Sequence, residues 1–148
     1  MTTLQNEITI NASVEKLWEI LADASILDQC DPTVKKCTLI SSNKSGIDAK
    51  RKVDMLDGKN WFEEKITVFE PYKALSFQLT DCSFPIKGLK HSYSFEKVGT
   101  QTKVKQLMEY TVKFGLLGKL LDSIMIRKQS DQGIKKFFAG LKQYAEKN

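Results

Sequence analysis

The C-terminal stretch from Leu116 to Glu146 is the longest segment with a helical pattern, and it constrains the fold more than any other. Its apolar residues recur at steps of three and four, which places them on one side of a helix. They form two patches: Leu117, Leu120, Leu121, Ile124 and Met125, then Ile134, Phe137, Phe138, Leu141, Tyr144 and Ala145. A helix of about 45 Å needs an extended apolar surface to pack against. The polar residues 127–133, which include a glycine, predict a bend or a second short helix between the patches.

Alternating polar and apolar residues predict the strands that supply this surface. A first strand from Leu4 to Asn11 is followed by a helix from Ser13 to about Asp23 and a helical turn from Ser25 to Gln29. The later strands are expected at Cys37–Ser41, Ile47–Met55, Asn60–Glu70, Ala74–Asp81, Leu89–Lys97 and Gln101–Lys113.

Short connections between these segments, such as Asp57-Gly58 and Gly99-Thr100, favour hairpins and therefore an antiparallel sheet. Layer packing then places the helices on one face of the sheet. The sequence predicts an α+β fold of one domain over residues 1–148, with a curved antiparallel sheet of about seven strands around a long C-terminal helix.

Composition is typical of a soluble globular chain, with 41% hydrophobic and 28% charged residues in 148. No apolar run is long enough for a transmembrane segment, and the N-terminus lacks the basic start and apolar core of a secretory signal. Three cysteines and one histidine in no ligand pattern predict free thiols, no metal site and no cofactor. We therefore expect a cytoplasmic protein.

The net charge of +5 raises the question of nucleic-acid binding. The basic residues are nearly all lysines scattered along the chain, and the only arginines are Arg51 and Arg127. Phosphate and guanine contacts favour arginine, and a nucleic-acid footprint clusters. We expect a solvated lysine-rich surface and no nucleic-acid partner.

Four stretches carry a resemblance to a known family. They are residues 10–23 (INASVEKLWEILAD), Glu64-x-Ile66 with Pro71 and Leu75-x-Phe77, Gly99-Thr100-x-Thr102-x-Val104, and the closing helix from Leu117 to Ala145. In this order they resemble the helix-grip fold of the START-like (SRPBCC) superfamily, in its polyketide cyclase/dehydrase and lipid-transport branch. The chain departs from the family at Cys30, where many relatives have tryptophan. The resemblance implies two short helices after the first strand and an apolar cavity, between sheet and final helix, that binds hydrophobic small molecules.

Several polar residues share the apolar, inward faces of the predicted strands: Arg51, Glu64, His91, Tyr93, Gln106 and Tyr110. Because isolated buried polar groups are costly, these residues should pair with one another or border a wet ligand pocket. The apolar residues expected to line that pocket are Phe62, Ile66, Phe77, Met108, Ile124 and Phe138.

Glu64 and His91 are the candidate catalytic residues. Glu64 in an apolar setting could act as a general acid or base, or it could form a structural salt bridge with Arg51. His91 could titrate beside a carboxylate, or it could be a hydrogen-bonded core residue. Tyr93 and Tyr110 could orient a ligand carbonyl or hydroxyl, or they could be packing rings with satisfied hydroxyls.

Three functions remain open from the sequence. The first is binding or carrying a hydrophobic small molecule such as a lipid, a polyketide-like compound or an isoprenoid. The second is a cyclase or dehydratase that acts on such a ligand. The third is a protein-interaction module, with a homodimer as one form, which uses the polar break of the last helix or Trp61 on the outer face of its strand. No glycine-rich phosphate loop or hydrolase triad is present, so those enzyme classes are not expected.

Overall fold

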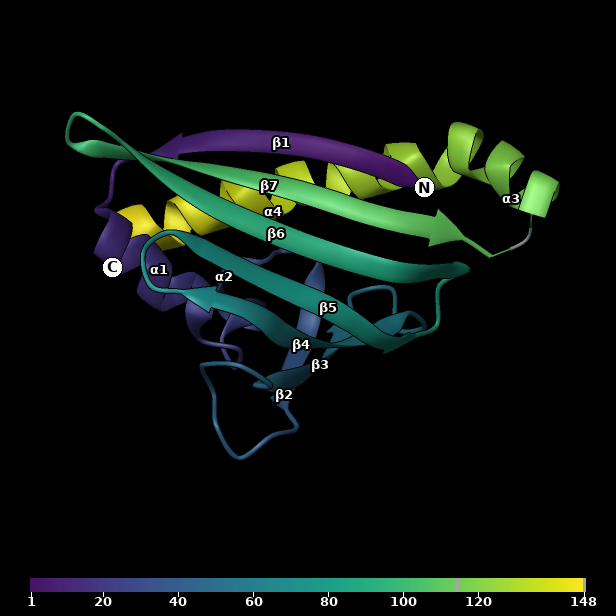
Figure 1. Cartoon of the computed structure of the whole chain (residues 1–148), viewed down its shortest axis with the longest axis horizontal. Helices are drawn as coiled ribbons and strands as arrows, with labels where there is room; N and C mark the ends of the chain where they lie inside the picture. Colours follow the sequence, from purple (N-terminus) through teal and green to yellow (C-terminus); the bar gives the residue numbers. More distant parts are fainter. Residues whose placement is uncertain (114, 148) are drawn as a thin grey trace.

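The fold is an antiparallel sheet whose concave face is crossed by a long C-terminal helix (Figure 1). The computed structural model describes residues 1–147 apart from residue 114, and the side chains of residues 118, 119, 121, 123 and 124 also lie outside the described part. Within it, seven strands lie in the order β1-β7-β6-β5-β4-β3-β2. Their bounds are β1 Thr2–Ile10, β2 Val34–Leu39, β3 Lys50–Met55, β4 Trp61–Glu70, β5 Ala74–Cys82, β6 Ile86–Val98 and β7 Gln101–Val112. The predicted α+β helix-grip fold is confirmed.

Strands β3 and β4 show how alternation positions the inner face of the sheet. Arg51 is buried while Lys52 points outward and lies over the Trp61 ring, 5.0 Å from its centroid. On β4, Glu64 and Ile66 are buried on the inner face. The β3–β4 register places Arg51 directly opposite Glu64, so the pleat delivers both side chains to the same side of the sheet.

The β3–β4 hairpin turns at Asp57 and Gly58, as the sequence predicts. The Asp57 carboxylate accepts hydrogen bonds from the backbone N–H groups of Lys59 and Asn60, both at 2.8 Å. These bonds hold the pKa of Asp57 below its usual value. Gly58 has φ of +71°, a left-handed conformation that glycine adopts without steric strain.

Five of the seven strands begin at a residue other than the predicted one, and three of them, β2, β3 and β6, differ by three residues. β3 starts at Lys50 rather than at Ile47. β6 starts at Ile86 because a bulge between Lys87 and Lys90 carries the strand through Gly88, a residue the sequence assigns to a connection. β2 covers Val34–Leu39 rather than Cys37–Ser41, and it too contains a register shift, between Val34 and Lys36.

Two short helices follow β1, as expected. In α1 (Val14–Ala22) the Ser13 hydroxyl accepts from the Lys16 N–H at 3.1 Å, which caps the helix, and the buried residues include Leu17, Trp18 and Leu21. Helix α2 (Leu27–Cys30) buries Leu27 and Cys30. The two helices lie near the C-terminal end of the long helix (Figure 1).

The C-terminal segment is α3 (Gly115–Leu121), a π-helical turn η1 (Asp122–Ile126) and α4 (Arg127–Lys147). Sequence analysis predicted an interruption at residues 127–133, and this was wrong. Helix α4 begins at Arg127 and runs through Gly133 without a break, and the irregular turn comes just before it. A π-turn inserts an extra residue and changes the direction of the helix without needing a glycine.

The described residues of the first predicted apolar patch are exposed. Leu117 and Leu120 are 63% and 56% exposed because α3 extends beyond the end of the sheet (Figure 1), and Met125 on η1 is 50% exposed. Leu121 and Ile124, the other members of this patch, have side chains outside the described part. The second patch is buried as predicted at Ile134, Phe137, Phe138, Leu141 and Ala145.

Polar contacts fasten the start of the long helix to the sheet. The Asp122 carboxylate accepts hydrogen bonds from the Thr2 hydroxyl and, at 2.5 Å, from the Tyr110 hydroxyl. Burial and the Asp122 carboxylate raise the pKa of Tyr110. The Asn6 amide donates to Asp131 at 3.1 Å, so β1, β7, η1 and α4 are joined at this end.

Gly140 is predicted to be essential for the close approach of α4 to α2. A Cβ at this position would lie 2.2 Å from the Cys30 carbonyl oxygen and 2.6 Å from Pro32 Cδ. Gly140→Ala should therefore lower the free energy of unfolding by about 1–3 kcal/mol, measured by urea denaturation.

Gly133→Ala is the matched control, because a Cβ at Gly133 meets nothing within 4 Å. The better helix propensity of alanine should raise stability there by up to about 1 kcal/mol, and equal effects at the two sites would contradict this account.

Candidate functional site

A cavity of about 480 Å³ lies between the inner face of the sheet and the η1–α4 segment. Strands β3, β4, β6 and β7 form one wall, and the helical segment with residues near α2 forms the other. Most of the exposed wall area is apolar, and it comes from Leu27, Met55, Phe62, Phe84, Pro85, Ile86, Leu89, Met108, Met125, Ile126, Ile134 and Phe137. This is the composition of a small-molecule pocket rather than of a solvent channel.

A buried ion pair forms part of the wall. The Arg51 Nε and Nη2 atoms both donate to Glu64 Oε1, at 2.8 and 2.6 Å. The guanidinium also lies over the Phe77 ring, 4.0 Å from its centroid. Burial acts to lower the pKa of Arg51, but the charge and hydrogen bonds of Glu64, together with the nearby Cys37 and Tyr93, raise it, and the net shift is upward. The salt bridge between Glu64 and Arg51, one of the two interpretations of Glu64 from the sequence, is therefore present.

Only one oxygen of Glu64 takes part in this pair. Glu64 is 2% exposed, and its Oε2 atom accepts no hydrogen bond from any described residue. A buried charged acceptor without a donor is rare in folded proteins and costs free energy. Because Glu64 also lines the cavity, its second oxygen has an unfilled acceptor position beside the ligand space.

A second polar cluster lies on β6 and β7. The Gln106 amide nitrogen approaches His91 Nδ1 at 3.1 Å and donates to the Tyr93 hydroxyl at 3.3 Å. If His91 Nδ1 accepts this hydrogen bond, the ring proton of the neutral imidazole is on Nε2. Burial lowers the pKa of His91, which favours that neutral form, and burial raises the pKa of Tyr93.

Asp31 and Thr33 bring a further polar group to the cavity from the loop after α2. The Asp31 carboxylate accepts from the Thr33 backbone N–H at 2.9 Å and from the Thr33 hydroxyl at 2.7 Å. Burial raises the pKa of Asp31, and these two hydrogen bonds oppose that shift. The polar groups of the sheet and of this loop therefore face the same cavity.

Seven of the residues selected from the sequence line this cavity. They are Arg51, Phe62, Glu64, His91, Tyr93, Gln106 and Met108. All lie on β3, β4, β6 or β7, where the period of two correctly identified the inner face.

Four other selected residues do not line the cavity. Ile66 and Phe138 are buried in the apolar core, and Phe138 packs against Phe137 with ring centroids 5.8 Å apart. The Phe77 ring packs against the Arg51 guanidinium, and the Tyr110 hydroxyl donates a hydrogen bond to Asp122. Ile124 is in η1, but its side chain lies outside the described part.

Sequence analysis missed the residues that the long helix contributes. Gln129, Ser130 and Gly133 line the cavity, although the polar stretch that contains them was predicted to form a bend or a second short helix and not a part of the site. They follow the same three- and four-residue steps as Ile126, Ile134 and Phe137, so the helical period continues through the polar stretch. That periodicity was the signal that could have identified them.

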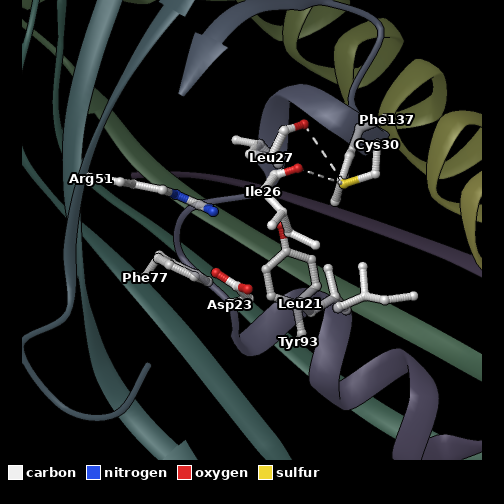
Figure 2. A pocket seen from close by; sticks show the side chains of 10 residues that line it. Leu21, Asp23, Ile26, Leu27, Cys30, Arg51, Phe77, Tyr93 and Phe137 are labelled. Carbon is white, nitrogen blue, oxygen red and sulfur yellow. Dashed lines mark hydrogen bonds between the residues drawn. The ribbon is translucent and has the colours of Figure 1, made fainter. Parts of the chain in front are cut away.

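A separate pocket of only about 10 Å³ lies beside Arg51, between the sheet and the two short helices (Figure 2). It is lined by Phe77, Tyr93, Phe137 and Cys30, among others. The Cys30 sulfur points to the carbonyl oxygens of Ile26 and Leu27, at 3.9 and 3.7 Å. Burial raises the pKa of Cys30 to about 12, so this thiol is a packing group rather than a nucleophile. The pocket has room for about one water molecule and not for a ligand.

The part of the chain that the structure describes contains no group of three or more His, Cys, Asp or Glu side chains placed to hold a metal ion. None of the helices in the same part of the chain combines the length and the hydropathy that crossing a membrane requires.

The sequence matches the family described as polyketide cyclase/dehydrase and lipid transport over residues 1–146. The chain belongs to this family. The predicted resemblance to the START-like superfamily is therefore confirmed over nearly the whole chain. No curated protein matches significantly.

Solved structures give the same fold at low sequence identity. A START superfamily protein from Mycobacterium smegmatis is 15% identical, with 98% of this chain and 97% of that chain covered and a TM-score of 0.80. The Zhui aromatase/cyclase from Streptomyces is 11% identical, with coverages of 98% and 93% and a TM-score of 0.82. A major latex-like protein from Panax ginseng is 12% identical, with 97% of both chains covered and a TM-score of 0.79. At these identities the likeness concerns the fold alone.

Replacing only Arg51 should destabilise the fold more than replacing both Arg51 and Glu64. Arg51→Met leaves Glu64 buried without its partner, so the free energy of unfolding should fall by about 3–5 kcal/mol. The double variant Arg51→Met/Glu64→Met removes both charges and should unfold within about 1 kcal/mol of the wild type. Urea denaturation of the two variants measures the difference. A double variant as unstable as the single one would contradict the pairing account.

The lowered pKa of His91 predicts a pH dependence of stability. Because the fold favours the neutral ring, the unfolded chain takes up this proton at a higher pH than the folded chain does. The contribution is fully present above the ordinary pKa of 6.5 and is lost as the pH falls below it. Between about pH 7.5 and about pH 5.5, the wild type should lose up to about 1.4 kcal/mol per pH unit more than His91→Gln. Parallel stability profiles of the two proteins would show that His91 is not held neutral.

Proposed function

We propose that this chain binds a hydrophobic small molecule, of a lipid, polyketide-like or isoprenoid class, in the cavity between the sheet and the C-terminal helix. The observation that carries the proposal is the cavity itself, about 480 Å³ with mainly apolar walls. That volume is within the range of about 300–1,000 Å³ common for ligand sites. Polar side chains on the sheet wall of the cavity, among them Arg51, Glu64, His91 and Gln106, would orient the ligand.

Family membership supports the same ligand class. The family description names polyketide cyclases, dehydrases and lipid transport, which share apolar small-molecule substrates or cargo. A neighbour of the same fold is called an aromatase/cyclase. These names belong to other proteins, and they agree with a site whose walls are apolar and aromatic.

The proposal is tested by a substitution on α4 that places a large side chain in the cavity. Gly133 lines the cavity and a Cβ there meets nothing within 4 Å, so Gly133→Phe should occupy part of the ligand volume. Native mass spectrometry after gentle purification, and thermal shift with a panel of lipids and polyketide-like compounds, should show a ligand on the wild type. Gly133→Phe should lose the bound mass and at least about tenfold in affinity, while Gly133→Ala should bind like the wild type.

A wild-type protein that arrives without ligand and gains no thermal stability from any compound in the panel would overturn the proposal. Equal binding by Gly133→Phe and Gly133→Ala would place the ligand elsewhere on the protein.

One observation favours a cyclase or dehydratase as a second candidate. Glu64, whose Oε2 accepts no hydrogen bond from a described residue, and His91 line one cavity, and a carboxylate with a neutral imidazole can move a proton to or from a ligand. Glu64→Gln and His91→Ala separate the two candidates. Loss of turnover with retained binding supports chemistry, and unchanged turnover of a substrate excludes these residues from it.

A further inference from the structure

The unused oxygen of Glu64 restricts the chemistry of the ligand. Arg51 gives both of its hydrogen bonds to Oε1, and Oε2 is left without a donor among the described residues although Glu64 is 2% exposed. A carboxylate oxygen in an ion pair can only accept a hydrogen bond. The group that complements Oε2 must therefore carry an O–H or N–H.

Gln106 adds a second polar contact at the same wall. Its nitrogen is engaged by His91 and Tyr93, and its Oε1, also buried, has no donor among the residues the structure describes. Rotation of a side-chain amide by 180° exchanges oxygen and nitrogen, so Gln106 can meet either a donor or an acceptor. Glu64 cannot make that exchange, and it therefore sets the requirement for a donor.

The charged groups of the cavity wall also disfavour an anionic ligand. The described lining residues include one arginine, Arg51, and two carboxylates, Asp31 and Glu64. Two Arg51 N–H groups are already given to Glu64, and the face of its guanidinium lies on Phe77. Because Asp31 and Glu64 outnumber Arg51 among the described charged groups of the lining, an anionic head group would meet a net negative charge.

We propose that the ligand is an amphipath with an uncharged or cationic head group, a hydroxyl or an amine, which donates a hydrogen bond to Glu64 Oε2. The rest of the ligand lies against apolar residues such as Phe62, Leu89 and Phe137. The inference rests on the proposed function of the cavity and goes further, because it excludes fatty acids and other carboxylates as preferred ligands.

The experiment compares ligands that differ only in the head group. The probes are decan-1-ol, decyl methyl ether and decanoate, and in an aromatic frame 2-naphthol, 2-methoxynaphthalene and 2-naphthoate. Isothermal titration calorimetry on the full chain at neutral pH gives the affinities. A hydrogen bond to a charged acceptor should make the hydroxyl compound bind at least about tenfold more tightly than its methyl ether, and the carboxylate should bind least tightly.

Variants assign the preference to Glu64. Glu64→Gln should bring alcohol and ether within about threefold and should improve carboxylate binding, because the charge is gone. If Glu64→Gln does not fold, Arg51→Met/Glu64→Met removes the pair together and should show the same loss of preference. Glu63→Gln is the matched control, since Glu63 is the neighbouring carboxylate on the opposite face of β4 and should leave the preference unchanged.

The outcomes separate the two proposals. If alcohol and ether bind the wild type within twofold of each other, or if the carboxylate binds best, the head-group inference is overturned while the ligand-binding function stands. If the preference survives both Glu64 variants, Glu64 is not its source and the inference is overturned in the same way. If no compound of either frame binds and the thermal-shift panel is also negative, the proposed function falls, and the inference falls with it.

Discussion

The structure depends on how α4 is held, because the helix is fastened at its two ends and leaves space beneath its middle. Toward the C-terminus, Phe138, Leu141 and Ala145 are buried in the core, and Gly140 allows the helix backbone to approach Cys30. At the other end the attachment is polar, through Asp122 and Asp131 to β1 and β7. A helix packed along its whole length would have filled the concave face of the sheet. Fastening at the ends preserves the cavity and still anchors the helix.

The polar part of the cavity wall is set by strand register. Arg51 and Glu64 are directly opposed on β3 and β4, and a shift of one residue would turn both side chains to the outer face. Apolar neighbours on the same strands, such as Val53 and Ile66, are fully buried and therefore oppose such a shift. The apolar core thus holds in place an ion pair that by itself adds little to stability, because desolvation offsets most of its Coulomb energy.

The periodicity of neighbouring residues predicted much of this site. It failed for features that depend on how the long helix packs against the sheet. The period of two placed Arg51, Glu64, His91 and Gln106 on the inner face, because that face depends only on neighbouring residues in one strand. Whether an inward residue borders the cavity or contacts the helix depends on where the helix crosses the sheet. The residue pattern within a single strand does not predict that position. Ile66 was therefore assigned to the pocket although it lies in the core. For the same reason, Leu117 was expected to pack although its helix extends past the sheet, where no surface remains to cover it.

The two edge strands limit how copies of this chain could associate. On β2, the exposed side chains of Lys35 and Lys36 and a register shift interrupt the edge. On β1, the Thr3 carbonyl oxygen already accepts from Arg127 at 3.3 Å. Neither edge offers an uninterrupted row of backbone groups, so continuation of the sheet into a second molecule, the usual first step toward fibrous aggregates, is opposed at both ends.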